Sequence, residues 1–234
     1  MQRILIIEDD ETIANIEKDY FEINDFEATI CTDALSGLNA VQHETFDLII
    51  LDLMLPGMDG FSACKKLRAI TDIPIIIVSA KHESADQVLG LGLGADNFIT
   101  KPFDPNVLVA MVKANLAGLV RCQKETTTNS DDFTVGPFTL NTQTRTITKN
   151  GQLLDLKNKE YELLAFLMKN KDVVFTKEDL YEEIWGLDSD GDTTTVAVHV
   201  NRIRQKIEDN PSHPVYLLTV WSVGYRFTVS LNSV

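Results

Sequence analysis

Carboxylate, hydroxyl and lysine side chains follow short apolar runs at four places in the first half of the sequence. In chain order, these side chains are Glu8 and Asp9, Asp52, Ser79, and Lys101. If the apolar runs form one parallel sheet, these residues meet at the carboxyl ends of its strands, where open α/β sheets bind ligands. Any one of them alone is more typical of a solvated loop. Four strand ends that carry complementary groups together predict a binding site.

The chemistry that suits this set is metal-assisted phosphoryl transfer. Several carboxylates at one sheet edge repel one another unless a cation lies between them, and hard oxygen ligands suit Mg²⁺. The ammonium of Lys101 and the hydroxyl of Ser79 can then bind phosphoryl oxygens, while one carboxylate acts as the nucleophile that accepts the phosphoryl group. Catalysis at such a site consists of positioning and charge neutralisation.

Alternating strand and helix patterns over residues 1–120 must position these groups. Three of the five strand-like runs are continuously apolar, as expected for strands buried on both faces of a parallel sheet. The expected strands are Arg3–Glu8, Glu27–Thr32, Leu48–Asp52, Ile75–Ser79 and Asn97–Thr100, and the expected helices lie near Glu11–Asn24, Ala34–Glu44, Gly60–Ala69, Glu83–Leu91 and Pro105–Leu119. Five βα units predict an α/β fold, specifically a doubly wound, flavodoxin-like (βα)5 domain.

The second half of the sequence has a different order of elements. Residues 121–132 are polar and lack an apolar period, so they are predicted to be a linker. The expected strands are Phe133–Val135, Phe138–Leu140, Thr144–Lys149, Gln152–Leu156, Val215–Val220 and Gly224–Val229, and the expected helices are Asn158–Lys169, Lys177–Trp185 and Thr194–Glu208. Strands, three helices and a final hairpin predict a winged helix-turn-helix domain over residues 133–234.

The last of these helices carries the residues that suit nucleic acid. An apolar stripe recurs at helical spacing at Val196, Val200, Ile203 and Ile207. The other faces carry His199, Asn201, Arg202, Arg204 and Lys206. Asparagine and arginine can pair with base edges, whereas histidine and lysine suit phosphates. Periodicity alone would equally allow an amphipathic helix with a solvated basic face.

Composition limits the classes of function. The net charge of −14 argues against nucleic acid as the partner, but residues 1–130 carry a net −10 and residues 131–234 only −4. The three cysteines, Cys31, Cys64 and Cys122, fit neither a disulfide framework nor a zinc site. No apolar run is long enough to span a membrane, and the N-terminus lacks a signal-peptide pattern, so we expect a cytoplasmic protein without a membrane partner.

The first half resembles the receiver domains of two-component response regulators. The resemblance rests on Glu8-Asp9, the run from Asp52 to Gly60 (DLMLPGMDG), Ser79-Ala80-Lys81 and Lys101-Pro102-Phe103. It implies that Asp52 is the phosphoacceptor and that Ser79 and Lys101 bind the phosphoryl oxygens. It also implies an Mg²⁺ site formed by Glu8, Asp9, Asp52 and the backbone carbonyl of Met54, and a cis peptide bond between Lys101 and Pro102. Phe98 occupies the position of the family's switch aromatic, which responds as Ser79 moves; plain core packing is the alternative.

The second half resembles the effector domain of the OmpR/PhoB-type subfamily. The matching strings are Trp185-Gly186, Thr195-Val196, Val198-His199-Val200, Arg202-Ile203-Arg204 and Val223-Gly224-Tyr225-Arg226-Phe227. The resemblance implies that the helix from Thr194 enters the major groove, with Thr195 among its contacts, and that the final hairpin is the wing. Trp221 lies where the family commonly has arginine, so we expect the wing to bind DNA more weakly than usual.

The resemblance also implies partners, which are promoter DNA, a sensor histidine kinase, RNA polymerase and a second copy of the chain on DNA. The loop Gly186–Asp192 either contacts the polymerase or is a solvated turn. The usual charged dimer face of the receiver is depleted here. We expect it to be weakened or replaced by an apolar contact through Leu89, Val107 and Met111, unless these residues belong to the core.

Together these patterns predict a transcriptional regulator controlled by phosphorylation. One alternative is a regulator that binds DNA with little dependence on phosphorylation, because of the altered dimer face. A metal-dependent phosphatase is disfavoured, because Leu53-Met54 after Asp52 breaks the Asp-x-Asp arrangement of aspartyl phosphatases. We therefore expect no enzyme beyond slow phosphorylation from small donors and slow self-dephosphorylation.

Overall fold

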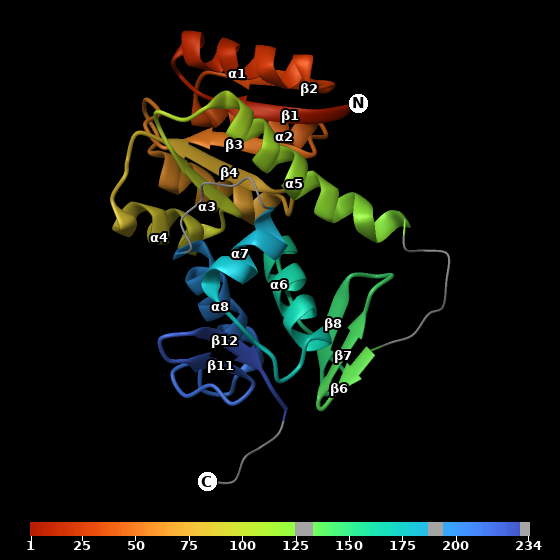
Figure 1. Cartoon of the computed structure of the whole chain (residues 1–234). Helices are drawn as coiled ribbons and strands as arrows, with labels where there is room; N and C mark the ends of the chain where they lie inside the picture. Colours follow the sequence, from red (N-terminus) through yellow and green to blue (C-terminus); the bar gives the residue numbers. More distant parts are fainter. Residues whose placement is uncertain (125–132, 187–193, 230–234) are drawn as a thin grey trace. The chain divides into compact units, whose positions relative to one another are not determined.

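The computed structural model describes residues 1–124, 133–186 and 194–229, and the chain folds into two compact units (Figure 1). Residues Met1–Leu116 belong to the first unit, and most of the remaining chain forms the second. Among the described residues, no helix has the length and apolar character required to cross a bilayer. The predicted α/β class is confirmed, with one parallel sheet in the first unit and antiparallel strands in the second.

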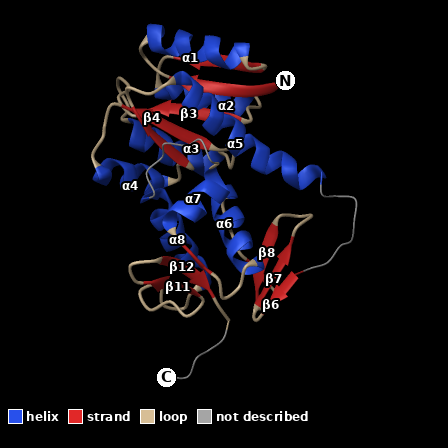
Figure 2. Cartoon of the chain, in the orientation of Figure 1, coloured by secondary structure: helices blue, strands red, loops and turns tan. Residues whose placement is uncertain are grey.

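A parallel sheet surrounded by helices forms the centre of the first unit (Figure 2). Its five strands have the order β2-β1-β3-β4-β5. The strands are β1 (Gln2–Ile7), β2 (Phe26–Cys31), β3 (Leu48–Asp52), β4 (Ile75–Ser79) and β5 (Asn97–Thr100). Every residue of β3 and β4 is buried, as continuous apolar runs predict for inner strands of a parallel sheet. This flavodoxin-like order places the point at which the winding reverses between β1 and β3.

Five helices connect and cover the sheet. They are α1 (Glu11–Ile23), α2 (Ala34–His43), α3 (Gly60–Ile70), α4 (Ser84–Leu93) and α5 (Pro105–Lys124). Right-handed crossovers put α1 on one face and α2, α3 and α4 on the other. A hydrogen bond of 2.6 Å from Lys113 on α5 to Asn24 after α1 places α5 on the α1 face. Aspartates Asp10, Asp33 and Asp59 cap α1, α2 and α3 by accepting backbone N–H groups of the first turn.

Helix α5 is longer than predicted. The sequence places its end near Leu119, but the helix continues to Lys124, so the first four residues of the predicted linker are helical. Polarity marked this segment as a linker, yet Arg121, Gln123 and Lys124 are good helix formers and the segment has no proline or glycine. Residues 125–132 of the predicted linker lie outside the described residues.

The second unit begins with a four-stranded antiparallel sheet of the order β6-β7-β8-β9, formed by β6 (Phe133–Val135), β7 (Phe138–Asn141), β8 (Thr146–Lys149) and β9 (Gln152–Leu153). The helices α6 (Asn158–Lys169), α7 (Lys177–Trp185) and α8 (Thr194–Ile207) follow. A hairpin of β11 (Leu217–Val220) and β12 (Gly224–Phe227) closes the domain. The predicted winged helix-turn-helix architecture is therefore confirmed.

One strand of the second unit was not predicted. The two-residue strand β10 (Val174–Phe175) pairs antiparallel with β12, which makes the final sheet three-stranded with the order β10-β12-β11. Two residues are too few to show a period of two, so the sequence carries no strand signal there. The strand joins the segment between α6 and α7 to the wing, at the point where Gly224 lies so close to Phe175 that a Cβ atom would collide with its carbonyl oxygen.

Candidate functional site

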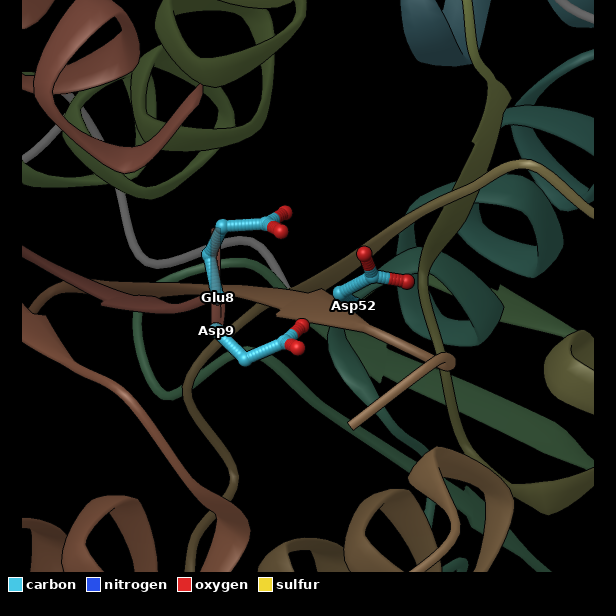
Figure 3. Close-up of side chains that lie close together, drawn as sticks. All are labelled: Glu8, Asp9 and Asp52. Atoms are coloured by element: carbon cyan, nitrogen blue, oxygen red, sulfur yellow. The ribbon is translucent and has the colours of Figure 1, made fainter. Parts of the chain in front are cut away.

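The reversal of winding brings three carboxylates together at the carboxyl edge of the first sheet. Glu8 and Asp9 follow β1, and Asp52 is the last residue of β3. Figure 3 shows their side chains converging, and one ligand oxygen from each lies within 4.8 Å of the other two. Glu8 and Asp52 are buried, whereas Asp9 is exposed. The predicted acidic cluster is therefore assembled, with one carboxylate open to solvent.

Lys101, which follows β5, reaches into this cluster. Its Nζ atom lies 2.5 Å from Oε2 of Glu8 and 2.6 Å from Oδ2 of Asp52. The peptide bond to Pro102 is cis, as the resemblance to receiver domains implies. Burial opposes the charge of the ammonium, but its hydrogen bonds to Asp52 and Glu8 outweigh burial and raise the pKa of Lys101. The single ammonium of Lys101 thus forms ion pairs with two buried carboxylates.

The electrostatics of the cluster favour an additional cation. Burial raises the pKa of Glu8; the hydrogen bond from Lys101 opposes this shift, and repulsion from Asp52 adds to it. A hard divalent cation between Glu8, Asp9 and Asp52 would relieve this repulsion, and three carboxylates at this spacing fit Mg²⁺. The backbone N–H of Met54 donates a 2.9 Å hydrogen bond to Oδ1 of Asp52, which fixes the carboxylate and puts Met54 in the loop beside the cluster.

The two predicted switch residues lie on the neighbouring strands. Ser79 is the last residue of β4 and is fully buried, and the residue before it, Val78, pairs with Asp52 in the sheet. Its Oγ atom accepts the backbone N–H of Lys81 at 3.3 Å. The ring of Phe98 on β5 is 8 % exposed and packs beside Gly90 of α4. The aromatic ring thus points inward, and its role as a switch stays a prediction.

A fourth carboxylate near the cluster was missed by sequence reasoning. Glu17 on α1 is 2 % exposed, and within the described part of the chain neither of its carboxylate oxygens has a hydrogen-bond partner. Burial, together with repulsion from Glu8, raises the pKa of Glu17 to about 8. The available signal was its spacing, because Glu17 lies three residues after Ala14 and four before Phe21, which are both buried.

The second predicted site, on α8, is only partly as expected. The apolar stripe is confirmed, since Val196, Val200, Ile203 and Ile207 are buried. Arg204, predicted to contact bases, donates instead to the Leu217 carbonyl at 2.9 Å and to Oγ1 of Thr219 at 2.8 Å. It is 9 % exposed and faces the Tyr225 ring, so its guanidinium is committed to β11 and β12.

His199 also leaves the predicted set of DNA contacts. It is 1 % exposed, and its ring packs edge-on against Trp185 with 5.1 Å between ring centroids. His199 and Arg204 lie three or four residues from members of the apolar stripe, which is the spacing that buries them. Thr195 is likewise buried, at 4 % exposure. These three predicted contacts therefore face the protein.

Buried Glu160 holds the two remaining basic residues of the helix. Its carboxylate lies 2.5 Å from Nζ of Lys206 and 3.8 Å from Nη1 of Arg202, and both cations keep part of their side chains exposed. Asn201 is exposed, as is Gln205, which the sequence had not singled out. In the wing, Trp221 is 86 % exposed. The outward surface is thus more neutral than predicted and includes Asn201, Gln205, Trp221 and parts of Arg202 and Lys206.

The predicted apolar dimer face is incomplete. Leu89 on α4 is 47 % exposed and Val107 on α5 is partly exposed. Met111 is 2 % exposed, and its sulfur accepts the side-chain amide of Asn97 at 3.6 Å. Met111 therefore belongs to the core, because it lies on the inward side of α5 between Leu108 and Asn115, both of which are buried. Of the loop Gly186–Asp192, residues 187–192 lie outside the described residues.

Known protein families match both halves of the chain. The family model "Response regulator receiver domain" matches residues 4–113, and "Transcriptional regulatory protein, C terminal" matches residues 151–227. The chain is 41 % identical over 231 residues to "Uncharacterized transcriptional regulatory protein YclJ" of Bacillus subtilis (strain 168), covering 96 % of this chain and 98 % of that protein.

Two further similarities cover almost the whole chain. "Sensory transduction protein RegX3" of Mycolicibacterium smegmatis is 39 % identical over 228 residues, which are 97 % of this chain and 99 % of that protein. The crystal structure of response regulator DrrB, described as a Thermotoga maritima OmpR/PhoB homolog, aligns with a TM-score of 0.51 and 28 % identity. That alignment covers 98 % of this chain and 100 % of DrrB.

Proposed function

Because this chain belongs to the OmpR/PhoB-type response regulators, with a receiver domain and a DNA-binding transcriptional domain, we propose that Mg²⁺-dependent phosphorylation of Asp52 controls its action on transcription. A sensor histidine kinase would donate the phosphoryl group. The observation that carries this proposal is the position of Lys101, whose ammonium lies within hydrogen-bonding distance of both Asp52 and Glu8 at the edge where Asp9 remains exposed.

The geometry around Asp52 suits a nucleophile. The N–H of Met54 holds one carboxylate oxygen and Lys101 holds the other, so the side chain is oriented before a donor arrives. Mg²⁺ bound by Glu8, Asp9, Asp52 and the carbonyl of Met54 would supply charge neutralisation for the incoming phosphoryl group. Lys101 would then exchange a carboxylate partner for a phosphoryl oxygen, and the buried hydroxyl of Ser79 would donate to another.

Mass spectrometry tests this step directly. The wild-type chain, incubated with acetyl phosphate and Mg²⁺, is expected to gain the mass of one phosphoryl group, whereas Asp52→Ala is not. Asp19→Ala, which removes an exposed aspartate of α1, serves as the matched control and should be labelled like wild type. An unlabelled wild type, or equal labelling of Asp52→Ala, would contradict the proposal. The label should decay slowly, since we propose no enzyme activity beyond self-phosphorylation and self-dephosphorylation.

We further propose that α8 reads promoter DNA in the major groove through Asn201, Gln205 and Arg202, while Trp221 contacts DNA from the wing. The exposure of Asn201, Gln205 and Trp221 supports this assignment. Duplexes selected from a random pool by the wild type are the appropriate probe. Asn201→Ala should relax the selected sequence, whereas Gln42→Ala, at an exposed position on α2 of the receiver domain, should not. Pairing of two copies on DNA, contact with RNA polymerase and action in the cytoplasm complete the proposal.

A second candidate is a regulator whose DNA binding depends little on phosphorylation. The composition of the α4–α5 face supports it, because exposed Leu89 and partly exposed Val107 lie where the subfamily commonly has charged residues. Comparing the affinity of the phosphorylated and unphosphorylated chain for the selected duplex separates the two candidates. A tighter complex after phosphorylation supports control by Asp52, and equal affinities support the second candidate.

A further inference from the structure

The β4–α4 loop, residues 80–83, engages the hydroxyl that the proposed chemistry requires. The Oγ atom of Ser79 accepts the backbone N–H of Lys81 at 3.3 Å. A serine hydroxyl has one hydrogen to donate and two lone pairs to accept with. When one lone pair is occupied by Lys81, the hydroxyl remains able to donate its hydrogen to another oxygen. The direction of this donor therefore depends on where the loop holds residue 81.

The side chain of Lys81 ties the loop to the helices on both sides. Its Nζ atom lies 3.2 Å from Oδ1 of Asp86, in the first turn of α4. The same atom lies 4.8 Å from the centroid of the Phe61 ring, in the first turn of α3. An ion pair and a cation–π contact thus act on one ammonium, and both constrain the backbone from which Lys81 donates to Ser79.

We propose that Lys81 is a positioning residue for phosphoryl transfer to Asp52, because its anchored side chain orients the hydroxyl of Ser79 toward the phosphoryl group. This inference rests on the proposed function. With acetyl phosphate as the donor, an oxygen of Asp52 forms the new bond to phosphorus. The bond from phosphorus to the acetyl oxygen breaks, and acetate leaves with the electron pair. Ser79 donates only a hydrogen bond to a phosphoryl oxygen, and Lys81 touches neither reactant.

Phosphorylation rates with acetyl phosphate and Mg²⁺ test the inference in four forms of the full chain. Lys81→Ala is expected to lower the rate constant roughly three- to thirtyfold, the range that one partly exposed ion pair plus one cation–π contact can supply. Lys81→Arg keeps a cation that can reach Asp86 and Phe61, and it should recover most of the rate. Lys66→Ala removes an exposed lysine of α3 and should leave the rate unchanged.

A double-mutant cycle separates positioning from a general effect on the fold. In the Ser79→Ala background, Lys81→Ala should lower the rate no further, because the hydroxyl on which Lys81 acts is gone. Without donor or Mg²⁺, amide hydrogen exchange at residue 81 should be faster in Lys81→Ala than in wild type. If Lys81→Ala is poorly folded, Asp86→Asn is used in its place in both measurements, because it removes the same ion pair from the other side.

The outcomes distinguish this inference from the proposed function. A wild type that takes up no phosphoryl group defeats the proposed function, and the inference fails with it. A wild type that is labelled while Lys81→Ala keeps the wild-type rate overturns the inference alone. Equal losses from Lys81→Ala in the presence and absence of the Ser79 hydroxyl overturn it as well. The inference is supported if Lys81→Ala slows labelling in the wild-type background but not in the Ser79→Ala background, and if Lys81→Arg is labelled at close to the wild-type rate.

Discussion

The buried carboxyl of Glu17 should make the receiver domain less stable as the pH rises. Its ordinary pKa is 4.5, and burial in the folded domain raises that pKa to about 8. Between these two values the folded chain retains a proton that the unfolded chain has released. The free energy of unfolding therefore falls by about 1.4 kcal/mol for each pH unit across this window, and it stops falling above the folded pKa.

At pH 7, about two and a half pH units above the ordinary pKa of 4.5, the buried carboxyl has lowered the free energy of unfolding by about 3 kcal/mol. Glu17→Met replaces the carboxyl by an apolar group of similar length, so it should raise the stability of the receiver by about that amount at pH 7. At pH 4, where the carboxyl is protonated in both states, this contribution should vanish. Asp19→Asn removes an exposed charge from the same helix and should not reproduce the pH dependence.

Calorimetry is the appropriate assay, because each domain can give its own transition. Tryptophan fluorescence would not report on the receiver, since both tryptophans, Trp185 and Trp221, lie in the effector domain. The receiver transition of wild type and Glu17→Met should diverge between pH 5 and pH 8 in the absence of Mg²⁺. Side-chain carboxyl NMR of Glu17 should show the same midpoint. A stability difference that is constant over this range, or a carboxyl that titrates near its ordinary value, would refute the reasoning.

Three further predictions concern other contacts. Arg204→Ala should destabilise the effector domain by about 2–4 kcal/mol, because it leaves two hydrogen-bond acceptors and the packed Tyr225 ring without the guanidinium. Urea unfolding followed by tryptophan fluorescence measures this loss, and a loss below about 1 kcal/mol would contradict the structural role of Arg204. Trp221→Arg should tighten DNA binding and steepen the slope of log affinity against log salt concentration by about one. An unchanged slope would mean that residue 221 does not approach a phosphate. Arg68→Met should destabilise the receiver by about 3–5 kcal/mol, because it removes the cation that lies 2.8 Å from the buried carboxylate of Asp96. Calorimetry checks this, and a receiver transition at the wild-type temperature would argue against it.

Most of the fold could be predicted because its elements are strongly patterned. The strands β3 and β4 are continuous apolar runs, and their predicted bounds match the structure. The end of α5 and the strand β10 could not be predicted in the same way. The residues after Leu119 favour a helix without forming an apolar stripe, and β10 is defined by its pairing with β12 rather than by its own two residues.

The two sites differed in how well the sequence predicted them. At the receiver site, strand ends in a parallel sheet must meet, so Asp52 and Lys101 were brought together by topology alone. On α8, residue type favoured DNA contact for His199 and Arg204. Their positions, three residues after Val196 and four after Val200 respectively, favoured burial, and both side chains are buried. Glu17 shows the same conflict, because its carboxylate argued for solvent while its position in the helix argued for the core.

The guanidinium of Arg204 joins the helix proposed to enter the major groove to the hairpin that forms the wing. Because Arg204 is bonded to both elements, the proposed DNA contacts of α8 and of Trp221 would keep a fixed separation that is set by the protein. Divergence of such a regulator toward new promoters would then proceed by exchanging outward residues such as Asn201 and Gln205, while the span of DNA between the two contacts stays constant.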